Sequence, residues 1–261
     1  MMAPALKKWG IILLFLSLWE LLPLSGLIDP LFLPRFSEVI LTILELCRSG
    51  ELQHHTRISL MRAFTALFAA VIIGMPLGLI LGGWFPRLQQ ATKPLMELFA
   101  AANPVILAHI IIFFLGIGES AKTFIIAWLC IWPIVFSTIS GIRTVDDSLL
   151  KAAGSLGLGR WRLFVMVILP SAAPSLFTGL RLAAGYAFIM LIAAEMMGGG
   201  SGLGWFVLQS QENYHVLRIF AGATVITFFA VLTDLPLKLL QNRWTFKEQE
   251  DEGGRYPRKS I

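Results

Sequence analysis

Two charged side chains stand inside apolar stretches of this 261-residue chain, where a charge is costly without a role or a partner. Arg181 lies in "FTGLRLA", and Glu195 lies in "LIAAEMMGGG". Their spacing on one helix corresponds to about 21 Å of rise and about 40° of rotation, so they share a face without touching. The residues allow two interpretations. They line a pathway for a solute, or each pairs with a neighbouring helix and orders the bundle.

A pair of residues, Asn103-Pro104, interrupts another apolar run. Proline lacks an N–H and frees a carbonyl, while the Asn amide both donates and accepts. Broken backbone at membrane depth occurs where it is buried in protein or lines a cavity. The substrate-pathway residues that we predict are Asn103, Pro104, Arg181, Glu195 and Met196.

Residue patterns for catalysis or metal binding do not occur in the sequence. It contains no GxxxxGK[ST], HExxH or GxSxG motif, and the adjacent His54 and His55 cannot share one helical face as metal ligands. The stretch "GGGSGLGW" (198–205) has no Lys-Ser/Thr pair, so we expect a flexible turn rather than a phosphate loop. We therefore predict no catalytic residue, no metal and no cofactor on this chain.

The composition places the chain in a membrane. It is 56% hydrophobic and 14% charged, with a mean hydropathy of +0.75, whereas soluble domains are about a quarter charged. Runs of about 20 apolar residues suffice to cross a bilayer. We predict an all-α integral membrane fold with six transmembrane helices, at 9–27, 60–84, 95–115, 121–142, 172–197 and 219–240.

The first apolar run could also be a secretory signal, but an uncleaved helix is favoured because several more spans follow. Lys and Arg gather before the first span and in alternate connections, which favours both termini in the cytoplasm. We interpret the net charge of +5 as this topological signal and not as a nucleic-acid surface. The expected organisation is a cytoplasmic N-terminus (1–8), a transmembrane domain (9–244) and a cytoplasmic tail (245–261).

Two further segments show helical patterns. Residues 33–55 are amphipathic and too polar to cross, so we expect a helix on the outer membrane surface. The second span carries a stripe of small residues that permits close helix packing, either within one subunit or between two copies. The stripe consists of Ala66, Ala70, Gly74, Gly78 and Gly82.

The connection 144–170 is predicted to be cytoplasmic and to contain a short helix. Asp146 and Asp147 are suitable N-caps for "SLLKAAGSL", and Gly157 is suited to the left-handed turn after it. "RWRLFVMVI" can then lie at the membrane interface, with Pro170 ending it before the fifth span.

The same connection carries a family resemblance. "KAAGSLGLGRWRLFVMVILP" (151–170) resembles the EAA motif of ATP-binding-cassette importer permeases, with Lys151 where the family often has Glu. The resemblance implies that this loop contacts an ATPase. The residues that it assigns to ATPase coupling are Asp147, Leu150, Lys151, Ala152, Ala153, Leu156, Gly157, Arg160 and Pro170.

Further segments, among them "FLPRFSEVI", "FFLGIGESAK" and "LPSAAPSLFTGLRLA", are similar to permeases of the nitrate/sulfonate/taurine subgroup. This resemblance implies the type I ABC importer permease fold in a bacterial inner membrane. It also implies two separate ATPase subunits that bind ATP and Mg, a second permease copy, an extracytoplasmic substrate-binding protein and a small, anionic solute.

Other interpretations remain. The third span reads "AAANPVILAH" where the subgroup commonly has an Arg-Pro-x-Pro-Pro stretch, so a different small organic solute is an alternative. Two paired paralogues could replace the homodimer. More remote alternatives are a membrane-embedded enzyme that uses Glu195 with a histidine, and a passive channel. Co-purification with an ATP-binding subunit separates the importer from both.

Overall fold

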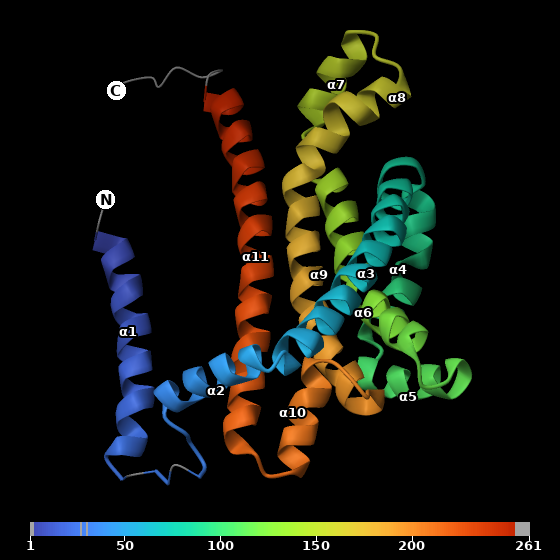
Figure 1. Cartoon of the computed structure of the whole chain (residues 1–261). Coiled ribbons are helices and arrows are strands. Elements are labelled where there is room, and N and C mark those ends of the chain that lie inside the picture. Colours follow the sequence, from blue (N-terminus) through green and yellow to red (C-terminus); the bar gives the residue numbers. More distant parts are fainter. Residues whose placement is uncertain (1–2, 27, 30, 254–261) are drawn as a thin grey trace. The chain divides into compact units, whose positions relative to one another are not determined.

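A computed structural model describes residues 3–26, 28–29 and 31–253, and side chains within 10–241 of these ranges. All regular structure in this part of the chain is helical, as predicted (Figure 1). The helices are α1 (Ala3–Leu24), α2 (Phe36–Arg48), α3 (Glu51–Leu79), α4 (Pro86–Ala101), α5 (Pro104–Leu115), α6 (Glu119–Arg143), α7 (Asp147–Ser155), α8 (Arg160–Leu163), α9 (Leu169–Gly198), α10 (Leu203–Glu212) and α11 (Val216–Gly253). Two π-helical segments, η1 (Ile80–Trp84) and η2 (Phe164–Ile168), continue α3 and precede α9.

The chain forms two compact units. Unit 1 contains the residues up to Leu60 together with Glu195–Phe228, and unit 2 contains Met61–Ala194 together with the residues from Phe229 onward. Three long helices, α3, α9 and α11, therefore contribute one end to unit 1 and the rest to unit 2. The fold of each unit is described separately below.

The predicted number of six spans is not confirmed. Among the residues searched, four helices are long and apolar enough to cross a membrane: Glu51–Trp84, Glu119–Arg143, Arg160–Gly198 and Val216–Gln241. A fifth is reached if α4 and α5, which meet at an 86° bend, together form one broken span. The apolar part of α1 at Gly10–Leu24 is shorter than the about 20 residues that a span needs.

The break in the third predicted span lies at Asn103, as its sequence indicates. Asn103 has an extended backbone, and its Oδ1 accepts the amide of Val105 at 2.9 Å, which caps α5. Pro104 takes the first helical position, where its missing N–H costs nothing. The sequence thus ends one helix and starts another here.

The stripe of small residues on α3 packs inside unit 2. A Cβ on Gly78 would lie 2.6 Å from the Cβ of Thr138, so α3 and α6 touch where only glycine fits. Gly74 and Gly82 face α6 in the same way, against Ile134 and Ile142. Of the two interpretations left open, the structure shows packing within one subunit.

Unit 1 holds the amphipathic helix that the sequence predicts, α2, against α1. The carboxylate of Glu20 accepts the backbone amide of Ser37 at 3.0 Å and its hydroxyl at 2.8 Å. Trp19 donates its indole N–H to the carbonyl of Pro34 at 3.1 Å. The first bond satisfies a free amide at the start of α2, and all three join α1 to α2 or to the residues just before it.

Pro170 does not end the preceding helical segment, which corrects the prediction. The helix is continuous from Arg160 to Gly198, with Pro170 as the second residue of α9. The π-helical segment η2 comes immediately before it, where the amide of Leu169 donates to the carbonyl of Phe164, five residues back. This wider turn lies where an α-helix would have to accommodate the proline ring.

Candidate functional site

The connection 144–170, for which the sequence predicts ATPase coupling, is called the coupling loop below. Its helix α7 begins with a side-chain cap. Asp146 is the N-cap of α7, and its Oδ1 accepts the amide of Ser148 at 2.8 Å. This backbone hydrogen bond, followed by that of the Ser148 hydroxyl, lowers the pKa of Asp146 from its ordinary value. Asp147, the other residue predicted as a cap, is the first residue of α7, where a negative charge is favourable.

The C-terminal end of α7 closes on itself through backbone bonds. Gly157 has a φ of +73°, and its amide donates to the carbonyl of Gly154 at 3.0 Å. The next amide, of Leu158, reaches back to the carbonyl of Ala153 at 3.3 Å. This pair of bonds is a Schellman motif, which confirms Gly157 as the left-handed cap.

The two alanines of the motif lie on different sides of α7. Ala153 is only 6% exposed and is covered by its own subunit, whereas Ala152 is exposed. Leu149 and Leu156 are 37% and 81% exposed, and both share the face of Ala152 at helical spacing. The accessible apolar face of the loop is therefore Leu149, Ala152 and Leu156. Lys151 and Arg160 are exposed, and Leu150 is half-buried.

Arg181 forms an ion pair between α9 and α11. Its guanidinium contacts both carboxylate oxygens of Asp234, with Nη2 at 2.9 Å from Oδ2. Both side chains are partly exposed, and no more than 40% of either is accessible. A bidentate pair of this kind satisfies two charges that would be costly alone in a bilayer.

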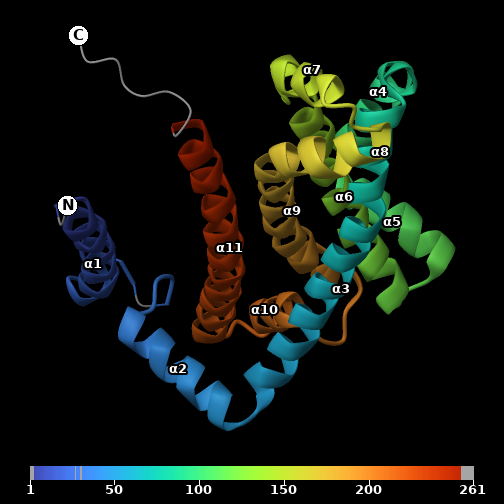
Figure 2. The same cartoon turned by 90° about the horizontal axis from the view of Figure 1, so that it is seen from above.

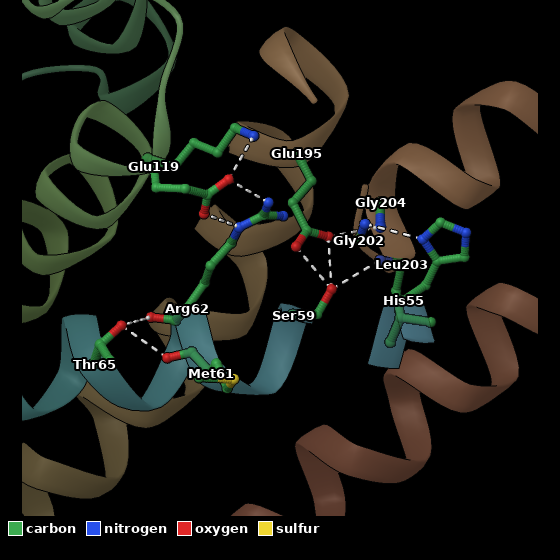
Figure 3. Close-up of polar contacts among 11 residues, drawn as sticks. His55, Ser59, Met61, Arg62, Thr65, Glu119, Glu195, Gly202, Leu203 and Gly204 are labelled. Atoms are coloured by element: carbon green, nitrogen blue, oxygen red, sulfur yellow. Dashed lines mark hydrogen bonds and ion pairs between the residues drawn. The ribbon is translucent and has the colours of Figure 1, made fainter. Parts of the chain in front are cut away.

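Glu195 lies near the C-terminal end of α9, in unit 1, and is fully buried. Its carboxylate points toward the first residues of α10 (Figure 3). Its carboxylate accepts the hydroxyl of Ser59 at 2.7 Å and the amide of Gly204 at 2.8 Å. Ser59 in turn accepts the amide of Leu203 at 2.8 Å. The negative charge thus meets the free amides of a helix N-terminus, where it is stabilised.

The turn before α10 is tightly bonded, so the expectation of a flexible turn at 198–205 is wrong. The amide of Gly202 donates to Nδ1 of His55 at 3.1 Å. Gly202 has a φ of +112°, and a Cβ there would lie 2.2 Å from the Glu195 carboxylate. Only glycine fits, because the carboxylate occupies the space of a side chain.

The predicted pathway residues have separate surroundings. Asn103 is an exposed helix cap, Arg181 pairs with Asp234, Glu195 binds Ser59 and Gly204, and Met196 is half-buried. Pro104 follows Asn103 in the cap of α5. Their role in a pathway stays a prediction.

The sequence reasoning assigned no structural partner to five polar residues that are bonded in the structure: Asp234, Ser59, His55, Arg62 and Glu119. Asp234 is an acid inside the predicted span 219–240, so the rule that identified Arg181 also applies to it. Ser59 and His55 have an i, i+4 spacing on α3, but nothing in the sequence indicates their partner. A second ion pair in unit 2 joins Arg62, 4% exposed, to Glu119 through two hydrogen bonds of 2.5 Å. Among the described residues, no group of three or more potential metal ligands occurs.

Comparison with known proteins identifies the family. The family described as "Binding-protein-dependent transport system inner membrane component" matches residues 74–246. The taurine transport system permease protein TauC of Escherichia coli K12 is 33% identical over 241 residues, which cover 90% of this chain and 87% of TauC. The bicarbonate transport system permease protein CmpB of Synechocystis is 29% identical, covering 88% of this chain and 85% of CmpB.

Solved structures agree on the fold. A chain of the MetNI methionine ABC transporter in an inward-facing conformation superposes with a TM-score of 0.61 at 17% identity, covering 71% of this chain and 92% of that one. A chain of a bacterial ABC transporter that imports alginate superposes with a TM-score of 0.58 at 12% identity, covering 93% and 97%. The fold is that of type I ABC importer permeases, and the chain belongs to the family of inner-membrane permeases of binding-protein-dependent ABC importers.

Proposed function

We propose that two copies of this chain form the translocation path of an importer for a small, anionic solute. Two separate ATPase subunits bind ATP and Mg, and an extracytoplasmic binding protein delivers the solute. As a family member the chain is a transport subunit and not an enzyme. Both termini and the loop 144–170 are cytoplasmic in this proposal, because Lys and Arg gather in these segments.

The coupling role is supported by one observation about α7. Its two ends are capped by residues of the same loop, and one apolar face of the helix is accessible. Asp146 and Gly157 close its ends through bonds within the loop. Leu149, Ala152 and Leu156 remain accessible on one side. An apolar helix face with a small residue in its middle suits a groove of a partner protein. Ala153 is buried against its own subunit, and in this proposal it contributes to coupling by seating α7 there.

The proposal of an anionic substrate is supported by the names of the relatives and by Arg181. The names of TauC and CmpB specify taurine and bicarbonate, and both solutes carry an acidic group. Arg181 supplies a cation within α9, held by Asp234 until an anion competes for it. Asn103 and Pro104 contribute the broken, exposed backbone at the α4–α5 bend. Because the third span departs from the subgroup, another small organic solute remains the second candidate.

The coupling face is tested with two glutamates on opposite sides of α7. Ala152→Glu places a charged, bulky group on the accessible apolar face, and it should reduce co-purification with the ATPase subunits at least tenfold. Gly154→Glu is the matched control, because position 154 lies about 200° further round the helix. A Cβ at Gly154 meets no atom within 4 Å, so the control side chain has room.

The measurement is the amount of ATPase subunit retained on tagged permease purified from a membrane extract. Equal retention by both variants would contradict the assigned docking face. A wild-type chain that retains no ATPase subunit at all would reject the proposed assembly with two ATPase subunits.

A further inference from the structure

A short corner between the second and third predicted spans contacts both ends of the coupling loop. This corner, Gly83–Gln89, comprises the last two residues of η1, Phe85 and the first turn of α4, all in unit 2. The ring of Trp84 lies 4.1 Å from that of Phe164 and 6.0 Å from that of Trp161, measured between centroids. Trp161 and Phe164 lie in the part of the coupling loop that follows α7, in α8 and η2, and α8 lies near α4 in Figure 2.

The backbone of the corner approaches this aromatic cluster as closely as atoms allow. A Cβ on Gly83 would lie 2.9 Å from Cε2 of Phe164, which is itself 7% exposed. Real Cβ atoms do not come that near to another heavy atom. Any larger residue at position 83 would push the ring of Phe164 away from Trp84.

A second contact reaches the other end of the coupling loop. Gln89 is 3% exposed, and its Oε1 accepts a hydrogen bond from Nη2 of Arg143. Arg143 is the last residue of α6, three positions before the cap of α7. The corner therefore contacts the segment before α7 through a hydrogen bond and the segment after α7 through tilted, packed aromatic rings.

Both helices that meet at the aromatic cluster are π-helical there. Trp84 ends η1, where the amide of Phe85 donates to the carbonyl of Ile80 at 3.1 Å, five residues back. Phe164 begins η2, which has the same bonding pattern. Single π-helical turns inside α-helices are local departures from regular geometry that frequently mark functional sites. Here the two π-helical segments meet through the rings of Trp84 and Phe164.

The corner also leads directly to the broken third span. Gln89 lies in the first turn of α4, and α4 ends at the 86° bend that exposes Asn103. A helix of 16 residues carries a displacement at its first turn over about 24 Å. A displacement of the first turn of α4 would therefore reach Asn103 at the bend.

We propose that Gly83–Gln89 is a joint that transmits movement of the coupling loop to α4 and the α4–α5 bend. The proposal rests on the coupling role proposed above, and it assigns to Gly83, Trp84 and Gln89 a positioning role. These residues act through α7 and α4 and need not touch either the solute or ATP. Contiguous packed and hydrogen-bonded contacts are the physical route for such coupling.

The test measures the bend and the ATPase separately, in the purified complex of permease and ATPase subunits. Asn103→Cys is introduced after Cys47→Ser and Cys130→Ala, and its labelling rate with a maleimide is compared without nucleotide and with ATP and vanadate. In the Asn103→Cys protein with residues 83–89 unchanged, we expect nucleotide to change this rate by about fivefold or more. Trp84→Ala and Gly83→Val should abolish the change while the ATPase subunits stay bound and hydrolyse ATP.

Two further variants distinguish a specific loss of the contact from general misfolding of the protein. Trp84→Phe keeps an aromatic ring and should keep at least half of the nucleotide effect. Leu88→Ala is the matched control in the same corner, because Leu88 is 51% exposed and belongs to neither contact. The proposed joint would be contradicted if nucleotide still changed the labelling rate in both Trp84→Ala and Gly83→Val. It would also be contradicted if Leu88→Ala lost this change to the same extent. Absence of bound ATPase subunits in the parent protein would instead reject the proposed function.

Discussion

The turn before α10 and the loop around α7 are both glycine-containing connections between long helices, yet they are held in opposite ways. In the turn, the amides of Gly202, Leu203 and Gly204 are bonded by side chains of α3 and α9. In the loop, α7 is capped by Asp146 and Gly157, which belong to the loop itself. A connection bonded by other helices is part of the scaffold, whereas a self-capped one can move as a unit.

The largest effect is expected at Gly202, where the turn has no room. Gly202→Ala would place a methyl group 2.2 Å from the Glu195 carboxylate at a φ of +112°. Backbone strain and displacement of the buried acid should destabilise the protein by about 3 kcal/mol or more. Thermal unfolding in detergent measures this loss. Gly200→Ala, whose Cβ meets nothing within 4 Å, is the control and should unfold near the wild-type temperature.

A smaller effect is expected at Ser59, which serves two partners. Ser59→Ala leaves the buried Glu195 carboxylate with one donor fewer and removes the hydroxyl that accepts the amide of Leu203. The substitution should lower the free energy of unfolding by about 1–3 kcal/mol. Thr65→Ala on the same helix removes a hydroxyl that bonds the carbonyls of Met61 and Arg62. Equal unfolding temperatures for the two variants would show that the turn does not depend on Ser59.

The smallest effect is expected in the loop, because Gly157 is conformationally special but not enclosed. Gly157→Ala adds a methyl group at a φ of +73° with no atom within 4 Å, at a cost of about 1 kcal/mol. Gly154→Ala, inside α7, should have the opposite sign and stabilise the helix by up to about 1 kcal/mol. Hydrogen exchange of the α7 amides measures both. Faster exchange in both variants would contradict the self-capped description.

The local features of the loop could be predicted because they depend on neighbouring residues. A cap at Asp146 and a left-handed Gly157 follow from side-chain chemistry and backbone sterics over about ten residues. The break at Asn103-Pro104 follows in the same way. Pro170 shows the limit of this reasoning, since the π-helical segment before it lets the helix continue.

The surroundings of the intramembrane charges could not be predicted. Arg181 and Asp234 lie 53 residues apart, and Ser59 and Glu195 lie 136 residues apart. Periodicity states which face of a helix a residue occupies, but not which helix packs there. The stripe of small residues on α3 likewise predicts close packing, while only the structure shows that its partner is α6.

The sequence by itself determined that the chain is helical, belongs in a bilayer and carries a capped loop with the motif of importer permeases. Composition, periodicity and capping are local properties, and they suffice for these conclusions. Only the tertiary structure decided that Glu195 secures a turn, that Arg181 pairs with Asp234 and that one corner holds both ends of the coupling loop. These depend on contacts between distant segments, where a buried charge or a missing side chain is matched by whichever helix packs against it.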